Sequence, residues 1–398
     1  MKQRKDLMMW RFNQLSIFLF FLMLMPLLKA QVQQDTARSE ATLQAKIDSL
    51  YDDSIIMHRL KAIEKSIPLT YHPYVKKWIK FFTERERFRR WFEKAIVRMW
   101  QYEPLIDQKL TEAGMPLELK YLALIESAYK YQATSRAYAV GIWQFIYSTG
   151  RIMGLKIDAY IDERRDPVKS TEAAIKYLSK LYKEFGDWHL AMAGYNAGER
   201  RVHWAIRKSR PADTTFWEIM RYLPAETRNY VPKYIAAVYL GHYYHLYGLR
   251  PDTVEPDVFV FSPEHYEEVE IQGGVSLLQI AHHLGIHHDT IIKLNPAWRM
   301  GRLPSNKTYT LRLPCDYVPL FYTMEDSIYK PVPEEVKKLE ARLFPRKIYH
   351  RVRKGETLSH IARRYGTSVR KLKAWNGIRG HLIYPGQKLV IYVSPRYN

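Results

Sequence analysis

A single glutamate interrupts an apolar stretch of the chain in a way that suits acid catalysis on sugars. Glu126 is the only charged residue between positions 121 and 129, and it shares one helix face with Leu119, Leu122 and Ala123 at i, i+3, i+4, i+7 spacing. Apolar residues fill the other faces, and such a helix is normally buried in a core. A carboxyl there is poorly solvated, so its pKa is predicted to rise. A glycosidase needs such an acid to protonate a leaving sugar oxygen.

The same pattern has a structural alternative, a buried glutamate satisfied by backbone donors or by an ion pair. Five segments that occur in order favour the catalytic interpretation. They are LALIES (122–127), AVGIWQF (139–145), DERRDP (162–167), LAMAGYNAG (190–198) and ETRNYVPK (226–233). Together they resemble the lytic transglycosylases of the goose-lysozyme-like class, and most closely the membrane-bound lytic murein transglycosylase D family. The resemblance covers about residues 71–248.

The resemblance implies a reaction that needs one carboxyl group. Glu126 would protonate the oxygen between N-acetylmuramic acid and N-acetylglucosamine and would then act as a base. As a base it would deprotonate the C6 hydroxyl of the muramoyl sugar, which attacks its own C1. The product is a 1,6-anhydro sugar, and the proximity of the internal nucleophile lessens the need for one from the protein.

The resemblance also implies a set of residues that bind the substrate or shape the cleft. They are Ser127, Ser135, Gly141, Trp143, Gln144, Tyr195, Asn196 and Tyr230. Ser127 is expected to fix local geometry through a hydrogen bond, and Tyr230 to help hold the protonation state of Glu126. Gly141 permits close backbone approach, although a turn would also explain it. Trp143 is expected either to stack on a sugar ring or to lie in the core.

A conventional glycosidase would need a second carboxylate beside Glu126. The next acids downstream are more than thirty residues away: Asp158, Asp162, Glu163 and Asp166. The last three lie among arginines, where ion pairing is expected. If Asp162 or Asp166 folds back into the site, the protein is instead a muramidase that uses water. A third interpretation, from another class, is a non-catalytic peptidoglycan-binding scaffold that retains the fold.

The composition limits the partners. The formal net charge is +21, and residues 346–398 contribute +12 of it. Charge alone would allow nucleic-acid binding, but the N-terminus resembles an export signal, so an anionic envelope polymer is favoured and no nucleic acid is expected. No cofactor and no metal are expected either, because His203, His242 and His245 lack the spacing of metal ligands.

Residues 1–30 are predicted to be a signal peptide or an uncleaved signal anchor. Basic residues precede a 14-residue apolar run, residues 15–28, which is too short for a typical membrane span. The only cysteine is Cys315, so neither an N-terminal lipid anchor nor an intrachain disulfide is expected. The protein is therefore expected in the periplasm or cell envelope, with membrane attachment through the apolar run as an alternative.

The elements that must position the site are predicted to be mainly helical. Residues 31–102 form a partly helical N-terminal extension, whose aromatic residues mainly pack against the next domain. The resemblance implies that residues 103–250 form a lysozyme-like (goose-type) helical catalytic domain. Linkers are predicted at 251–265 and at 315–347, where prolines cluster.

Two repeats, residues 266–314 and 348–393, complete the chain and align with each other at an offset of about 80 positions. Each is predicted to contain a strand, two helices and a closing strand. The second resembles a LysM module, a fold that binds N-acetylglucosamine-containing glycans. The first is degenerate, with Val275 and Asn306 at positions where the pattern has other residues. The predicted fold class is mainly α with two small βααβ LysM modules, and peptidoglycan glycan strands are the expected partner of cleft and modules.

Overall fold

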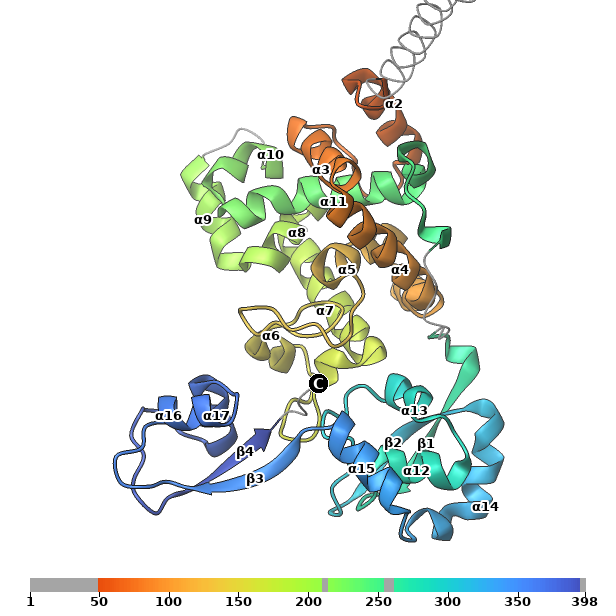
Figure 1. The fold of residues 1–398 in the computed structure, drawn as a ribbon. Coiled ribbons are helices and arrows are strands. Elements are labelled where there is room, and N and C mark those ends of the chain that lie inside the picture. The colour runs from red at the N-terminus through yellow and green to blue at the C-terminus, as the bar shows by residue number, and fades with distance from the viewer. Residues whose placement is uncertain (1–48, 210–213, 254–260, 394–398) are drawn as a thin grey trace, which may run out of the picture.

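The computed structural model describes residues 49–209, 214–253 and 261–393 of the 398-residue chain. The predicted signal segment, residues 1–30, lies outside them. In these three ranges no helix is both long enough and apolar enough to cross a lipid bilayer. A large helical domain is followed by two smaller modules that contain short strands (Figure 1). The predicted fold class, mainly α with two βααβ modules, is confirmed.

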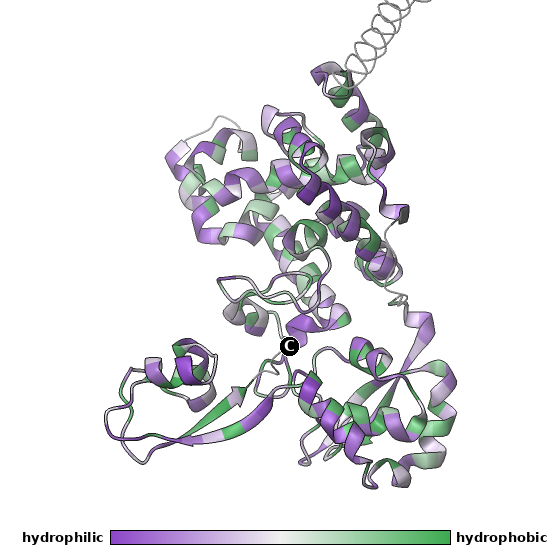
Figure 2. Cartoon of the chain, in the orientation of Figure 1, coloured by the Kyte–Doolittle hydropathy of each residue, from purple (hydrophilic) through white to green (hydrophobic). Residues whose placement is uncertain are grey.

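The helical domain is built around α11, which packs against α3, α5 and α8 (Figure 1). Its helices are α2 (Asp53–Ile63), α3 (Pro73–Glu84), α4 (Glu86–Glu112), α5 (Lys120–Ser127), α6 (Tyr147–Ile152), α7 (Pro167–Phe185), α8 (Trp188–Ala197), α9 (Glu199–Ser209), α10 (Phe216–Ile219) and α11 (Ala225–Tyr243). Hydrophobic and hydrophilic residues alternate along most of them (Figure 2), as expected of helices with one buried face.

Local sequence explains where α7 and α8 begin. Asp166 caps α7 by accepting hydrogen bonds from backbone N–H groups of its first turn, and a proline occupies the first helical position. The helix ends at Gly186, whose φ of 67° is left-handed. Asp187 then caps α8 in the same way. The two helices pack closely, and the rings of Tyr177 and Tyr195 lie 5.4 Å apart.

The predicted N-terminal extension is an integral part of the helical domain. The helix α4 runs across the predicted boundary at residue 102 without interruption. Phe82 of α3 and Phe92 of α4 are fully buried in the same core as Leu122 of α5. Part of the aromatic stripe therefore packs as predicted. The boundary does not separate two structural units, because one hydrophobic core spans it.

The first module contains an antiparallel strand pair and two helices, β1 (Tyr266–Gln272), α12 (Leu277–Leu284), α13 (His288–Leu294) and β2 (Thr308–Pro314). The register pairs Val269 with Leu311. The structure differs from the prediction for residues 315–347, which are not a plain linker. They form α14 (Val318–Ile328) and α15 (Glu334–Leu343), and Phe321 of α14 lies in the core of the module. Pro331, Pro333 and Pro345, from which the linker was predicted, lie between or after these helices, and Pro333 is the N-cap residue of α15.

The second module repeats the same order with β3 (Arg346–Arg351), α16 (Leu358–Arg364), α17 (Val369–Asn376) and β4 (Lys388–Val393). The antiparallel register pairs Ile348 with Ile391. The module has a small core of its own, made of aliphatic side chains from both helices and both strands. It touches the helical domain where Ser368 lies 3.3 Å from the hydroxyl of Tyr138 and Arg370 stacks 4.3 Å from the Tyr138 ring.

The first module is fixed to the helical domain by a buried ion pair. Arg312 of β2 donates to Asp166 at 2.7 Å and to Glu268 at 3.1 Å. The side chains of Arg312 and Asp166 are only 6% and 8% exposed. A second contact between the two units is an isolated antiparallel bridge between Ile161 and Trp298. Asp166 therefore caps α7 and also neutralises an arginine of the neighbouring module.

Candidate active site

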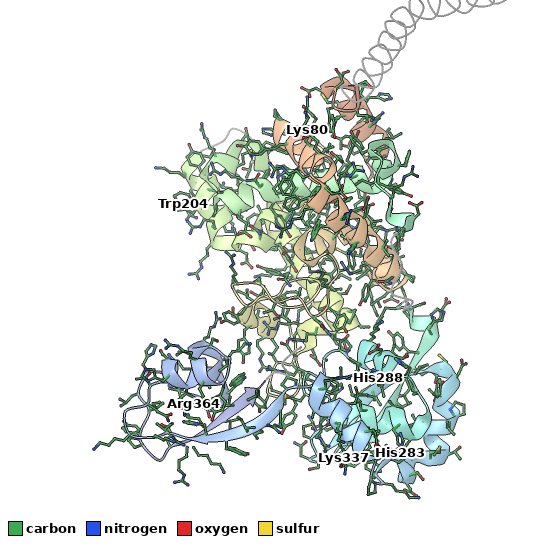
Figure 3. The ribbon with its side chains drawn as sticks, in the orientation of Figure 1. Lys80, Trp204, His283, His288, Lys337 and Arg364 are labelled. Atoms are coloured by element: carbon green, nitrogen blue, oxygen red, sulfur yellow. The ribbon has the colours of Figure 1, made fainter. Side chains whose placement is uncertain are left out.

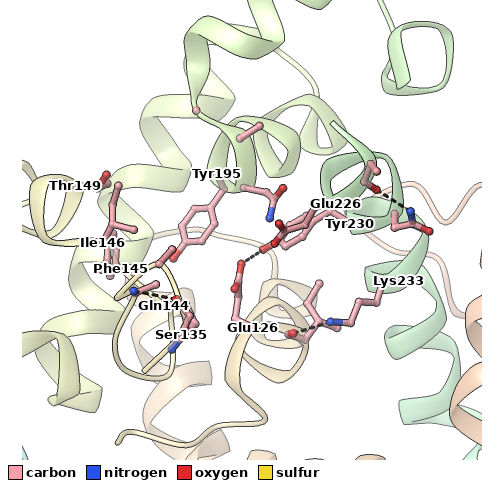
Figure 4. A pocket seen from close by; sticks show the side chains of 18 of the residues that line it. Glu126, Ser135, Gln144, Phe145, Ile146, Thr149, Tyr195, Glu226, Tyr230 and Lys233 are labelled. Atoms are coloured by element: carbon pink, nitrogen blue, oxygen red, sulfur yellow. Dashed lines mark hydrogen bonds between the residues drawn. The ribbon is translucent and has the colours of Figure 1, made fainter. Parts of the chain in front are cut away.

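Glu126 lies in the last turn of α5, on the wall of a cleft of about 990 Å³. The cleft is lined by residues of α3, α5, α8 and α11 and by the loop between α5 and α6. Figure 4 shows the Glu126 carboxyl between two groups of side chains, with Ser135 and Gln144 on one side and Tyr230 and Lys233 on the other. The volume is in the range of small-molecule binding sites.

The Glu126 carboxyl has an environment that favours its protonated form. Its pKa is raised to about 7, mainly because burial disfavours the charged form, with a smaller contribution from the nearby charge of Glu226. Two groups act in the opposite direction. The Tyr230 hydroxyl donates a hydrogen bond to Glu126 Oε1 at 2.6 Å, and the charge of Lys233 also lowers the Glu126 pKa. The result is a carboxyl that can both give and take a proton near neutral pH.

Lys233 is a cleft residue that the sequence analysis did not single out. Its ammonium group donates to the carbonyl of Ile125 at 2.9 Å, which fixes it beside the acid. Burial lowers the Lys233 pKa, while the charges of Glu126 and Glu226 oppose that shift. Glu226, Tyr230 and Lys233 follow one another at i, i+4, i+7 spacing. That spacing places all three on one face of α11 and was a signal available in the sequence.

Tyr195 and Asn196 line the cleft from α8, as the resemblance implied. The Tyr195 hydroxyl donates to the carbonyl of Trp143 at 2.7 Å, which ties α8 to the loop after α5. The Asn196 side-chain oxygen accepts a hydrogen bond from Thr227 at 2.8 Å. This contact orients the amide of Asn196 and leaves its two N–H donors available for a ligand.

The loop between α5 and α6 brings Ser135 and Gln144 to the cleft wall. Gln144 has a left-handed φ of 51°, and its side-chain amide donates back to the carbonyl of Gly141 at 2.7 Å. Ser127 lies outside the cleft lining, and its hydroxyl donates to the carbonyl of Ile142 at 2.8 Å. The expected hydrogen bond of Ser127 is thus present and fixes the loop on α5.

Two predicted substrate contacts are corrected. Trp143 is 0% exposed, and its indole N–H donates to Thr171 at 2.9 Å, so it lies in the core and presents no face to a sugar. Gly141 does not line the cleft either. Its φ is 87°, and a Cβ there would overlap the carbonyl oxygen of Arg164. The close backbone approach expected at Gly141 is therefore to the protein itself.

The acids considered as a second carboxylate do not reach the cleft. Asp162 accepts hydrogen bonds from Arg164 at 2.8 Å, and Asp166 is paired with Arg312. Ion pairing, the simpler expectation, explains both. Glu226 is instead the second carboxylate of the cleft lining. The sequence around Glu126 does not indicate this role, because Glu226 lies a hundred residues further along the chain, on α11.

Residues before the predicted catalytic domain form one wall of the cleft. Trp78 and Phe81 of α3 are half-buried cleft residues with ring centroids 5.0 Å apart. The Trp78 indole N–H donates to Asn229 at 3.2 Å, and Lys233 lies 5.7 Å from the Trp78 ring. This wall was missed because the aromatic stripe was assigned to packing as a whole, and spacing alone does not separate its buried members from its exposed ones.

One group in the described part of the chain has the geometry to hold a metal ion. His287, His288 and Asp289 bring three ligand atoms within 4.8 Å of one another at the start of α13. They belong to the first module, and none of them lines the cleft around Glu126.

Comparison with known proteins agrees with this geometry. The family model described as the transglycosylase SLT domain matches residues 103–217. The model of the LysM domain matches residues 350–391, and the model described as the LysM-like domain of lytic transglycosylase MltD matches residues 265–330. The last match extends past the predicted module boundary at 314 and includes α14. The part of the helical domain that contains Glu126, Tyr195 and Asn196 thus matches the transglycosylase SLT domain.

A curated relative covers most of the chain. The membrane-bound lytic murein transglycosylase D of Escherichia coli strain K12 is 35% identical over 314 residues, which are 77% of this chain and 66% of that protein. The autolysin of Enterococcus faecalis is 54% identical over 43 residues, which are 11% of this chain and 6% of that protein. The chain belongs to the membrane-bound lytic murein transglycosylase D family, and it spans 66% of the length of the Escherichia coli member.

Proposed function

We propose that the protein is a peptidoglycan lytic transglycosylase that cleaves the β-1,4 bond between N-acetylmuramic acid and N-acetylglucosamine and leaves 1,6-anhydro ends. The observation that carries the proposal is Glu126, whose pKa is raised by burial to about 7 and whose carboxyl is held by Tyr230 on the wall of an open cleft. The match to the transglycosylase SLT domain supports the same conclusion.

The chemistry follows from one carboxyl group that acts twice. Glu126 gives its proton to the glycosidic oxygen as the bond from C1 to that oxygen breaks. The resulting carboxylate takes the proton of the muramoyl C6 hydroxyl while the C6 oxygen bonds to C1. Glu126 is then protonated again, and no water is consumed. Internal attack is effective because the nucleophile is already positioned next to C1.

Neighbouring groups stabilise the charges that develop. The Tyr230 hydroxyl and the Lys233 ammonium group both favour the carboxylate that exists between the two proton transfers. Asn196, oriented by Thr227, can donate to the 2-acetamido group of the sugar that is attacked. Ser135 and Gln144 lie on the other side of Glu126 from Tyr230 and Lys233, where they can contact the same sugar.

The two C-terminal modules bear on the proposed partner, and the N-terminal segment bears on the proposed location in the cell. We expect the LysM modules to bind glycan strands and to raise the local concentration of the cleft on an insoluble polymer. The relative from Escherichia coli is named as membrane-bound. That name supports a location in the cell envelope, with export or membrane attachment through residues 1–30.

The proposal is tested by release of soluble fragments from purified sacculi by the full chain, by Glu126→Gln and by Glu226→Gln. We expect Glu126→Gln to lose about 10³-fold in rate, and Glu226→Gln to lose less than about tenfold. Comparable losses in both variants would favour a muramidase, the alternative that the second cleft carboxylate Glu226 supports. If the unmodified chain binds sacculi but releases no soluble fragments, the result would favour the non-catalytic peptidoglycan-binding scaffold.

A further inference from the structure

A side pocket opens from the cleft next to α9. It has a volume of about 390 Å³ and shares four lining residues with the main cleft, Thr149, Tyr177, Ala197 and Gly198. The two spaces therefore lie next to each other. A Cβ at Gly198, one of the shared residues, would meet no atom within 4 Å, so no protein atom fills the space beside it. A substrate that occupies the main cleft can extend a branch into the side pocket.

The charges of the two spaces differ. The charged residues that line the main cleft are Lys77, Glu126, Glu226 and Lys233, two basic and two acidic. This balance suits the uncharged hydroxyl and acetamido groups of a glycan strand. The charged residues that line the side pocket are mostly basic.

Three of the four charged residues that line the side pocket are basic. Its single acid, Glu199, is already paired with Lys180 at 2.6 Å. The guanidinium groups of Arg200 and Arg201 form no ion pair with any residue that the structure describes. Two exposed arginines thus leave a net positive charge of two in this pocket, and that charge suits a ligand with carboxylates.

Apolar side chains complete the side pocket. Ile152 at the end of α6 is 71% exposed, and Met153 lines the pocket beside it. Trp204 of α9 does not line the pocket, but its ring is exposed (Figure 3), and the ring centroid lies 5.9 Å from the Arg201 guanidinium. A ligand that carries both carboxylates and small apolar groups therefore finds partners for both.

We propose that this pocket binds the anionic peptide branch of the glycan strand, with Arg200 and Arg201 as specificity-determining residues. The inference rests on the proposed function. In peptidoglycan the muramoyl sugar carries a short peptide with free carboxylates and alanine methyl groups, and that peptide must leave the cleft at the side. The side pocket offers a positively charged, partly apolar exit next to Tyr177, which packs against Tyr195 of the cleft wall.

The test compares two substrates for the full chain, uncross-linked strands that carry peptides and the same strands after an amidase has removed the peptides. The variant is Arg200→Ala with Arg201→Ala. We expect kcat/KM to fall about tenfold on the peptide-bearing strands and to change less than about twofold on the stripped ones. High salt should abolish most of the difference.

The matched control is Arg207→Ala with Lys208→Ala, which removes the same charge from α9 outside the pocket. It should cleave both substrates like the unmodified chain. Equal losses on both substrates, or equal losses in both double variants, would overturn the inference and leave the proposed function intact.

A second readout is independent of cleavage. In the Glu126→Gln background, the arginine pair should strengthen binding of peptide-bearing strands over stripped strands about tenfold. Absence of this difference would also overturn the inference. Failure of the proposed function would appear separately, as an unmodified chain that binds the strands and cleaves neither substrate.

Discussion

At the scale of single residues, the proposed reaction depends on whether the Glu126 carboxyl is protonated. Burial holds the Glu126 pKa at about 7, well above its ordinary value of 4.5. The proposed first step needs the protonated acid, which is the major form below that pH. We expect kcat/KM on soluble strands to be highest below pH 7 and to fall about tenfold per pH unit above it. A rate that stays constant from pH 7 to pH 9 would contradict the assignment.

Tyr230 gives a second prediction at this scale. Its hydrogen bond to Glu126 lowers the pKa of that carboxyl, so Tyr230→Phe should move the alkaline limb of the profile to higher pH. The carboxylate formed during the reaction also loses a charge-assisted hydrogen bond of about 1.5–3 kcal/mol, so kcat should fall about tenfold or more. Tyr243→Phe, on the same helix outside the cleft, should change neither quantity. An unshifted limb in Tyr230→Phe would refute this role.

At the scale of elements, the sequence predicts helices better than it predicts which helices meet. The apolar spacing around Glu126 predicted a buried helix, and α5 is one. Spacing within α11 also places Tyr230 and Lys233 on one face. It does not indicate that this face meets α5, because helix pairing depends on packing between segments about a hundred residues apart. Spacing within α3 likewise does not show that Trp78 lines the cleft while Phe82 is buried in the core.

The α3 wall is tested through substrate binding. Trp78 offers an aromatic face to the cleft, while the reacting groups belong to α5 and α11. Stacking of a sugar on such a ring is worth about 0.5–1.5 kcal/mol. Trp78→Ala should therefore raise KM about fivefold and leave kcat nearly unchanged. Trp100→Ala removes an exposed tryptophan of α4 that does not line the cleft. Equal effects of both changes on KM would argue against a stacking wall.

At the scale of the whole molecule, the modules were predictable and their docking was not. Two aligned repeats indicated two βααβ units, and the structure contains both. Nothing in their spacing shows that Arg312 reaches Asp166 of the helical domain. The arginine-rich segment around Asp166 correctly indicated ion pairs, but the partner lies in another unit. Such contacts are decided by tertiary packing, which a repeat pattern does not encode.

The Arg312–Asp166 pair predicts a loss of stability. Both side chains are buried, so Arg312→Ala would leave an unpaired carboxylate and lower the free energy of unfolding by about 3 kcal/mol. Arg302→Ala breaks an ion pair with Glu340 in which the arginine is 50% exposed, and it should cost less than about 1 kcal/mol. Urea unfolding measures both. Similar stabilities of the two variants would contradict a docking role for Arg312.

In the proposed reaction one carboxyl group cleaves the strand without water. Mass spectrometry of the fragments released from purified sacculi in water enriched in ¹⁸O distinguishes this reaction from hydrolysis. We predict 1,6-anhydromuramoyl ends that contain no ¹⁸O, and their absence with Glu126→Gln. Reducing ends that carry one ¹⁸O atom would contradict the account, because they would show that water attacks C1 and that a second carboxylate, with Glu226 the first candidate, takes part.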